Sequence, residues 1–285
     1  MFSVRTPFRR SFSTLALSAL LLVGVGCQSL SVLNSGGQSA SGTEVLHRII
    51  ETGALRVGMT GAQPPLNMKN KLGEMIGLDV ELAQALAEAM QVELVLVEMP
   101  FADLLSGLEA NQVDMVISSM TITPARNARV AFAGPYLISG SSLLTRGELA
   151  KTLLTRASLN SPERSWAALE GSTGEALILE VVPLAKYVGI EDQEVAVAKI
   201  ANGEIDGLVA DHPFVQYQIA RHPELDLATL ASPFTTEPLG IALPPNSPLF
   251  ANLVQNYLNT LEYTGQLIQM KARWLNVGEW MSELD

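Results

Sequence analysis

The stretch Asp114-Met-Val-Ile-Ser-Ser-Met-Thr-Ile-Thr-Pro-Ala-Arg126 has the pattern of a buried strand, a polar turn and the start of a helix. Met115 to Ile117 is a short apolar run, as in a strand that is covered on both faces. Thr123 can cap a helix, and Pro124 suits its first position. Arg126 would then lie in the first turn, where a cation opposes the helix dipole, so a bound anion explains it better than helix stability does. Ser and Thr are also ordinary turn residues, and Arg126 could simply face solvent.

Strand and helix patterns alternate on both sides of this stretch. Residues 77–90 have the pattern of an amphipathic helix with one apolar face, and shorter apolar runs before and after it suit strands. The alternation begins again near Trp166, which indicates a second unit of the same kind. Extended stretches near residues 137–146 and 231–238 could connect the two units. The sequence therefore predicts an α/β fold with largely parallel strands and helices on both faces.

Composition limits the classes of function. The chain has 285 residues, 48% of them hydrophobic, which allows one large or two medium domains with sizeable cores. Its formal net charge is −11, which argues against non-specific binding to nucleic acid, because that needs a basic face. The sequence has no nucleophile elbow, no P-loop lysine motif and no zinc signature, and its three histidines lack metal-ligand spacing. We therefore expect no catalytic residues, no metal and no cofactor.

The N-terminus has the pattern of a bacterial export signal. Three arginines precede the apolar run 15–26, which is too short to span a membrane comfortably, and Cys27 follows it directly. Val25-Gly26-Cys27 resembles a lipobox, so we predict a lipoprotein signal peptide over residues 1–26 and lipidation of Cys27. A plain signal peptide is the alternative, because Gly24 stands where a lipobox usually has Leu. The general secretory and twin-arginine export routes both stay open.

Cys27 is the only cysteine in the chain, so no disulfide can form within it. Residues 27–43 are rich in Ser and Gly, and we expect them to form a flexible tether between the lipid and the folded part. The protein would therefore be exported to the periplasmic or cell-surface side and be lipid-anchored to the membrane.

Five motifs occur in the same order as in the bacterial family-3 extracellular solute-binding proteins, which this chain resembles from about Leu55 to Trp274. They are Gly77-Leu-Asp-Val-Glu-Leu-Ala83, Val113-Asp-Met-Val-Ile-Ser-Ser-Met-Thr-Ile-Thr-Pro-Ala-Arg126, Phe132-Ala-Gly-Pro-Tyr136, Gly171-Ser-Thr173 and Ile205-Asp-Gly-Leu-Val-Ala-Asp211. Members of this family are the polar amino-acid receptors of ABC importers. The resemblance implies a two-lobed, periplasmic-binding-protein-like fold of type II, with two crossing strands forming a hinge. Lobe 1 would comprise residues 44–140 and 235–285, and lobe 2 residues 141–234.

The resemblance also implies an amino-acid site between the lobes. Arg126 matches the arginine that grips the α-carboxylate of the ligand, Thr121 matches a supporting hydroxyl, and Thr173 matches the donor from lobe 2. Asp211 matches the carboxylate that pairs with the α-ammonium group. This assignment agrees with the physics, because a zwitterion removed from water needs both of its charges matched. Thr173 and Asp211 could instead be helix caps.

Five further positions are expected near the ligand. Ser119 and, less directly, Ser118 match positions whose polar groups meet it. Phe101 matches the aromatic platform of lobe 1, although it could also be part of the core. Gln63 and Thr60 lie in the loop after the first strand. Members of the family often have an aromatic residue where this chain has Gln63. Receptors for cationic side chains often have an acid where this chain has Thr60.

The missing aromatic residue and the missing acid argue against Lys, Arg or His as the ligand, although a ligand with a basic side chain stays open. Glu237, at the return crossing between the lobes, could supply the missing acid or be a surface carboxylate.

The resemblance implies the substrate-binding component of an ABC importer for amino acids. Its partners would be a small-molecule amino acid held between two closing lobes, the membrane permease that receives it, and the membrane through the lipid on Cys27. The alternative is a periplasmic enzyme related to cyclohexadienyl dehydratase on the same fold, acting on prephenate or arogenate with Glu237 or Asp211 as general acid. A sensor module would need a membrane span, and no apolar run after Cys27 is long enough.

Overall fold

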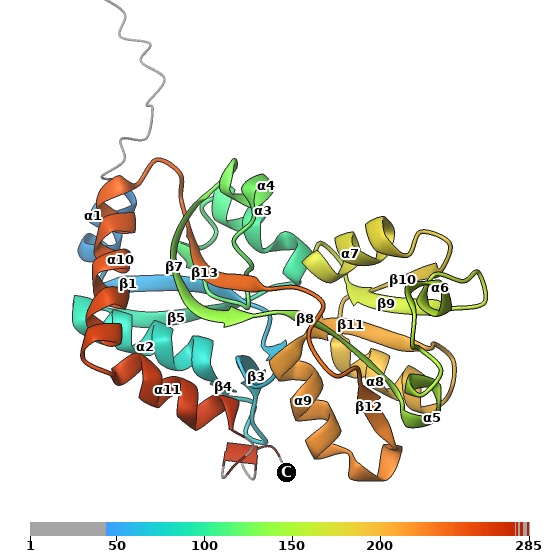
Figure 1. Ribbon diagram of the computed structural model, residues 1–285. Coiled ribbons are helices and arrows are strands. Elements are labelled where there is room, and N and C mark those ends of the chain that lie inside the picture. The colour runs from blue at the N-terminus through green and yellow to red at the C-terminus, as the bar shows by residue number, and fades with distance from the viewer. Residues whose placement is uncertain (1–43, 277, 279, 282–283, 285) are drawn as a thin grey trace, which may run out of the picture. The chain divides into compact units, whose positions relative to one another are not determined.

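The computed structural model describes residues 44–276, 278, 280, 281 and 284. They form two five-stranded sheets and one small three-stranded sheet (Figure 1). The predicted signal peptide, the lipidation site Cys27 and the tether 27–43 lie outside the described residues. Within the described part of the chain, no helix is long and apolar enough to cross a membrane.

The first large sheet has the strand order β5-β1-β6-β13-β7. Strands β1, β5 and β6 are parallel, whereas β13 runs antiparallel to both β6 and β7. Its strands are β1 (Ala54–Met59), β5 (Glu93–Glu98), β6 (Met115–Val116), β7 (Ala131–Ser139) and β13 (Glu237–Leu243). The helices of this unit are α1 (Glu44–Thr52), α2 (Leu78–Met90), η1 (Phe101–Asp103), α3 (Leu104–Glu109), α4 (Pro124–Asn127), α10 (Pro248–Tyr263) and α11 (Gln266–Leu275). The small sheet, β2 (Ala62–Gln63), β3 (Asn67–Lys69) and β4 (Met75–Ile76), follows β1.

The second large sheet has the order β10-β9-β11-β8-β12. Strands β9, β10 and β11 are parallel, and the two connections between them each contain a helix, as in β–α–β units. Strand β8 runs antiparallel to its two neighbours, β11 and β12. Its strands are β8 (Ser141–Arg146), β9 (Ser165–Leu169), β10 (Lys186–Ile190), β11 (Gly207–Asp211) and β12 (Leu227–Thr229). Its helices are α5 (Gly147–Ala150), α6 (Arg156–Leu159), α7 (Thr173–Val181), α8 (Gln193–Ala201), α9 (His212–Arg221) and η2 (Pro223–Leu225).

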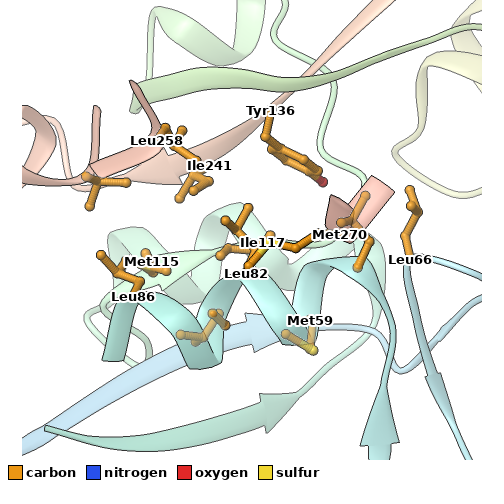
Figure 2. Packing of buried hydrophobic residues seen from close by; sticks show 14 of the residues in the cluster. Met59, Leu66, Leu82, Leu86, Met115, Ile117, Tyr136, Ile241, Leu258 and Met270 are labelled. Carbon is orange, nitrogen blue, oxygen red and sulfur yellow. The ribbon is translucent and has the colours of Figure 1, made fainter. Parts of the chain in front are cut away.

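Each large sheet is covered on both faces, as the sequence predicts. Helix α3 packs on one face of the first sheet, and α2, α10 and α11 pack on the other (Figure 1). Figure 2 shows the second of these cores, where Leu82 and Leu86 of α2 lie beside Met115, Ile117 and Ile241 of the sheet. In the second unit α7 covers one face, and α8 and α9 cover the other.

Two connections join the sheets. Strand β7 ends at Ser139 and β8 begins at Ser141, so one extended segment passes from the first sheet to the second (Figure 1). The return passes through Thr235 and enters β13 at Glu237, which pairs with Ser139. The two connections run so close together that a Cβ atom on Gly140 would lie 2.2 Å from the carbonyl oxygen of Thr235. This approach requires glycine, and the ends of β7, β8 and β13 meet at the crossing.

The expectation of largely parallel strands is wrong in part, because both large sheets are mixed. Strands β13 and β8, which lie next to the two crossings, each run antiparallel to both of their neighbours. Strand β10, at the edge of the second sheet, was not predicted from the sequence. Its residues are mostly half-exposed, so it lacks the continuous apolar run of a buried strand.

Candidate functional site

Side chains from both sheets surround one small cavity beside the crossing strands. The cavity has a volume of about 20 Å³, which is room for about one water molecule. Its lining comes from the loop after β6, the start of η1, the N-termini of α7 and α8, and the ends of β8 and β11. The lining residues are Gln63, Phe101, Ser119, Thr121, Ser141, Leu169, Ser172, Thr173, Gly174, Gln193, Val209, Ala210 and Asp211.

Helix α4 begins as the sequence predicts. Thr123 is its N-cap and accepts a hydrogen bond from the backbone N–H of Arg126 at 3.2 Å, and Pro124 occupies the first turn. The Arg126 guanidinium donates to the carbonyl oxygen of Thr121 at 2.9 Å and to that of Gly171 at 3.0 Å. It also lies over the ring of Phe101, with 5.5 Å between its central carbon and the ring centroid. Arg126 therefore contacts Thr121 and Phe101, which line the cavity, and connects the two units through Gly171.

Burial lowers the pKa of the Arg126 guanidinium, and the negative charges of Glu237 and Asp211 partly oppose this effect. The group nevertheless keeps its charge at neutral pH, because an arginine side chain is not deprotonated in proteins. Two N–H donors of its planar fork bind the carbonyl oxygens of Thr121 and Gly171.

The turn before α7 brings Gly171 and Thr173 to the same place. Gly171 has φ +75°, and a Cβ atom there would lie 3.3 Å from the backbone of Ala102, so glycine suits both the turn and the close approach. Ser172 is the N-cap of α7 and accepts from the N–H of Glu175 at 3.2 Å. Because Ser172 performs the capping, the Thr173 hydroxyl is directed elsewhere and donates to Glu237 at 2.7 Å.

Glu237 lies at the centre of a cluster of hydroxyl groups. Its Oε2 accepts from Thr121 and from Thr173, each at 2.7 Å, and its Oε1 accepts from Ser141 at 2.5 Å and from Thr235 at 2.7 Å. The residue is only 5% exposed, so the interpretation of Glu237 as a surface carboxylate is wrong. Burial by itself raises the pKa of Glu237, but the four hydroxyl donors together lower it below its ordinary value.

Asp211 ends β11 and precedes α9, whose N-cap it is. Its carboxylate makes no capping hydrogen bond, so the alternative of a simple helix cap does not describe it. The side chain lines the cavity instead. Burial raises the pKa of Asp211 to about 8, the charges of Glu237 and Asp79 add to this, and Arg126 opposes it. The carboxyl group of Asp211 is therefore largely protonated at neutral pH in this environment.

The loop after β6 is held in an unusual conformation. Ser119 has φ +49°, in the left-handed region, and its N–H donates to the buried carboxylate of Asp79 at 3.1 Å. Its hydroxyl lines the cavity and has no hydrogen-bond partner among the described residues. Buried polar atoms are normally paired, so this hydroxyl is free to form a hydrogen bond with a molecule in the cavity.

Three other predicted site residues, Ser118, Gln63 and Thr60, belong to a hydrogen-bond network within the first unit. The Ser118 hydroxyl donates to Gln63 Oε1 at 2.8 Å and accepts from the backbone N–H of Thr60 at 3.1 Å. Thr60 donates to Asn67 at 2.8 Å. Gln63 itself lines the cavity, whereas Thr60 and Ser118 lie behind it and orient it.

The structure thus brings Gln63, Phe101, Ser119, Thr121, Thr173 and Asp211 to one cavity, and Arg126 lies over the ring of Phe101 without lining the cavity itself. Gln193, the first residue of α8, was not predicted from the sequence, and its buried Oε1 has no partner in the described part of the chain. The signal was Asp192, a typical N-cap, which places Gln193 at the start of a helix that follows a strand. Ser141 and Thr235 were also missed. Among the described residues, no group of three or more His, Cys, Asp or Glu side chains is placed to hold a metal ion.

Known proteins share this sequence pattern. ABC transporter arginine-binding protein 1 of Escherichia coli strain K12 is 27% identical over 226 residues, which cover 77% of this chain and 90% of that protein. Cyclohexadienyl dehydratase of Pseudomonas aeruginosa is 27% identical over 230 residues, with 81% and 85% covered. The relatives therefore include both a binding protein and an enzyme.

Solved structures share the fold. A protein of Wolinella succinogenes, described as a binding component of an ABC transporter and solved with lysine, has a TM-score of 0.77 and 33% identity, covering 81% of this chain and 99% of that chain. An ancestral amino-acid-binding protein, described as a precursor of cyclohexadienyl dehydratase, has a TM-score of 0.76 and 31% identity with the same coverage. This chain accordingly has the two-lobed α/β fold of periplasmic binding proteins, with the crossing strands between the lobes. The model of the bacterial extracellular solute-binding proteins, family 3, matches residues 55–277, and the chain belongs to that family.

Proposed function

We propose that this protein is the amino-acid-binding component of an ABC importer, which takes up its ligand between two lobes and delivers it to a membrane permease. The observation that carries the proposal is that Thr121, Thr173 and Asp211 line one cavity, and that the Arg126 guanidinium donates to the carbonyl oxygen of Thr121. These groups come from both sheets and match the two charges of an α-amino acid. Relatives named as arginine-binding and cystine-binding proteins of transporters support the same class of function.

In the proposed complex the α-carboxylate lies between the Arg126 guanidinium and the hydroxyls of Thr121 and Thr173. Charge-assisted hydrogen bonds of this kind are among the stronger ones in proteins. The α-ammonium lies beside Asp211, where a positive charge would favour the ionised carboxylate. The Ser119 hydroxyl and the Gln193 amide oxygen, which have no partners among the described residues, provide further contacts.

The balance of charge favours a ligand with an additional cation. The site holds one guanidinium, on Arg126, and two carboxyl groups, on Asp211 and Glu237. A zwitterion alone would leave one negative charge uncompensated when both acids are ionised, whereas a basic side chain would balance it. A structural neighbour was solved with lysine, and several relatives are named for arginine. Basic amino acids are therefore the first ligands to test.

The two lobes of the proposal are residues 44–140 with 235–285, and residues 141–234. The sheet β5-β1-β6-β13-β7 falls in the first set, and the sheet β10-β9-β11-β8-β12 falls in the second. Contacts made by a ligand with both lobes would favour the closed state, and the permease would recognise closure.

The test is a thermal-shift screen of the full chain, carrying Cys27→Ser, with the twenty amino acids and cystine. A ligand at one hundred times its dissociation constant stabilises a protein by about 2.7 kcal/mol. For a domain of this size the expected increase in Tm is about 5–11 °C. The shift should be lost in Arg126→Ala and kept in Arg129→Ala, whose side chain pairs with Glu109 on the surface. A shift that survives Arg126→Ala would place the carboxylate site elsewhere.

A dehydratase is the second candidate. One observation favours it: Asp211 lies in the cavity, and burial raises its pKa to about 8, so it could donate a proton at neutral pH. A relative is named cyclohexadienyl dehydratase. Turnover of prephenate, lost in Asp211→Asn, would establish the enzyme, and no turnover together with amino-acid binding would establish the receptor.

The proposal includes export and a lipid anchor on Cys27. Members of this family are extracellular or periplasmic proteins. The apolar run before Cys27 and the Ser/Gly-rich residues after it support an anchored protein with a flexible tether. Expression in a bacterium should place the protein in the membrane fraction, and Cys27→Ser should release it to the soluble fraction. Equal distribution of both forms would contradict the anchor.

A further inference from the structure

A side chain of the second lobe lies in the hydrophobic core of the first. Tyr217 belongs to α9, whose Phe214 and Val215 pack in the core of the second lobe. The Tyr217 ring instead packs with Trp274 and Trp280, and among the described residues every other member of that cluster belongs to the first lobe. These three aromatic residues are only 4–8% exposed. None of them lines the cavity of the candidate site, so this contact between the lobes is separate from it.

The two tryptophans are fixed to the first lobe. Trp274 lies in the last turn of α11, and its indole N–H donates to Glu81 of α2 at 2.6 Å. Trp280 packs on Trp274 with 5.8 Å between the ring centroids, and its indole N–H donates to the carbonyl oxygen of Asn276 at 3.0 Å. Both indole N–H groups are therefore paired within the first lobe, and the faces of the rings are left for packing.

The Trp280 ring stacks on the Tyr217 ring, with 5.6 Å between the centroids and an angle of 26° between the planes. Arg221, one turn later in α9, lies over the same tyrosine ring at 5.9 Å, so Tyr217 is also held from its own lobe. Figure 1 shows the C-terminal end of the chain between α11 and α9. The two lobes thus meet in an aromatic contact, Tyr217 with Trp280, in addition to the two crossing strands.

A rotation of one lobe against the other must change this aromatic contact. Helix α9 begins beside the crossing, where the N–H of His212 donates to the carbonyl oxygen of Gly140 at 2.8 Å. Tyr217 is five residues further along the helix, which is about 7.5 Å from that end. A rotation about the crossing therefore displaces Tyr217 relative to Trp280, and a stacked pair tolerates centroid distances of only about 4.5–7 Å.

The rings are stacked in the arrangement in which Arg126 of the first lobe donates to the Gly171 carbonyl oxygen of the second. We propose that Trp280 stacks on Tyr217 when a ligand closes the lobes, and that this contact raises the affinity for the ligand without touching it. The inference rests on the proposed function, because it needs a ligand that drives closure. A ligand that binds the closed state gains apparent affinity from any contact that stabilises this state relative to the open one.

Tryptophan emission tests whether the contact changes on binding. The chain has three tryptophans, at positions 166, 274 and 280. The amino acid found in the thermal-shift screen should change the emission of the full chain, and Trp280→Phe should lose most of that change. Trp166→Phe is the matched control and should keep it, because Trp166 lies in the core on the α7 face of the second lobe. An equal change of emission in both variants would overturn the proposal.

Affinity measures what the contact contributes. In calorimetry with the same amino acid, Tyr217→Leu and Trp280→Leu should each bind about 2- to 10-fold more weakly, as expected for the loss of one aromatic pair. The double variant should lose little more than either single variant, because both substitutions remove the same contact. Trp280→Phe keeps a ring and should bind almost as tightly as wild type. Tyr263→Leu is the matched control and should bind as wild type does, because Tyr263, at the end of α10, is 84% exposed.

The outcomes separate this inference from the proposed function. Binding that depends on Arg126 but is equally tight in Trp280→Leu and Tyr263→Leu would support the receptor and reject the role of the aromatic contact. If wild type binds none of the amino acids in the screen, the receptor is rejected, and this inference is rejected with it. If Trp280→Leu does not fold, the emission of Trp280→Phe still decides the matter, because that variant keeps an aromatic ring in the core.

Discussion

The carboxylate of Asp79 accepts a hydrogen bond at 3.1 Å from the backbone N–H of Ser119, a residue 40 positions later in the chain. Ser119 has φ +49°, a conformation that costs a residue with a side chain about 1–2 kcal/mol. Asp79 is fully buried and also accepts from the Tyr136 hydroxyl at 2.7 Å and from the Asn67 amide at 2.8 Å. A single buried carboxylate thus fixes the turn that presents Ser119 and Thr121 to the cavity.

Removal of this carboxylate should loosen the turn and destabilise the protein. Asp79→Ala leaves the Tyr136 hydroxyl, the Asn67 amide and the Ser119 N–H without their acceptor, and each buried unpaired group costs about 1–3 kcal/mol. We expect a loss of about 3 kcal/mol or more in the free energy of unfolding, measured by urea denaturation. Asp79→Asn should lose less, because it keeps the volume and one acceptor oxygen. Asp103→Asn, at an exposed position, is the control and should change little.

Phe101 should affect ligand binding more than stability. Its ring lies under the Arg126 guanidinium, and a contact of this kind contributes about 0.5–2 kcal/mol. Phe101→Leu keeps an apolar side chain in the core but removes the ring, so affinity for the ligand found in the screen should fall about 2- to 30-fold. Phe132→Leu is the matched control, because Phe132 packs against the same core cluster. Equal affinities of the two variants in calorimetry would show that the ring does not position the guanidinium.

The sequence predicted most of the local structure around this site. Thr123 and Pro124 begin a helix, as the cap and the proline indicate, and Arg126 lies in its first turn. Such features depend on neighbouring residues in the chain, so propensity and spacing reveal them.

The features that the sequence did not reveal depend on long-range pairing. Glu237 and Thr121 are 116 positions apart, and no local pattern indicates that a carboxylate before Pro238 will be surrounded by hydroxyls. The direction of β13 was missed for the same reason. The roles of the site residues in ligand binding stay predictions until a ligand is measured.

The stability of the ligand-free protein should depend on Asp211 above pH 4. Burial raises the pKa of this carboxyl group from 3.8 to about 8, so between these values the folded chain binds a proton that the unfolded chain has lost. Its contribution to stability is therefore complete below about pH 4 and is lost as the pH rises to about 8. Asp211→Asn should remove this part of the pH dependence. The comparison is Tm against pH for both proteins, and parallel curves would contradict a raised pKa.

Ligand binding should release a proton from Asp211. In the proposed complex the α-ammonium lies beside this carboxyl group, and a nearby positive charge lowers its pKa. At pH 7, below the value of about 8 in the empty site, the group is mostly protonated, so binding should release a large fraction of one proton. Calorimetry in two buffers with different ionisation enthalpies measures this number, because the observed enthalpy changes with the buffer in proportion to the protons released. Asp211→Asn should show no such dependence, although it should bind more weakly. If wild-type binding releases no proton at pH 7 but does depend on Arg126, the ammonium group binds away from Asp211, and Glu237 becomes the acid to examine as its partner.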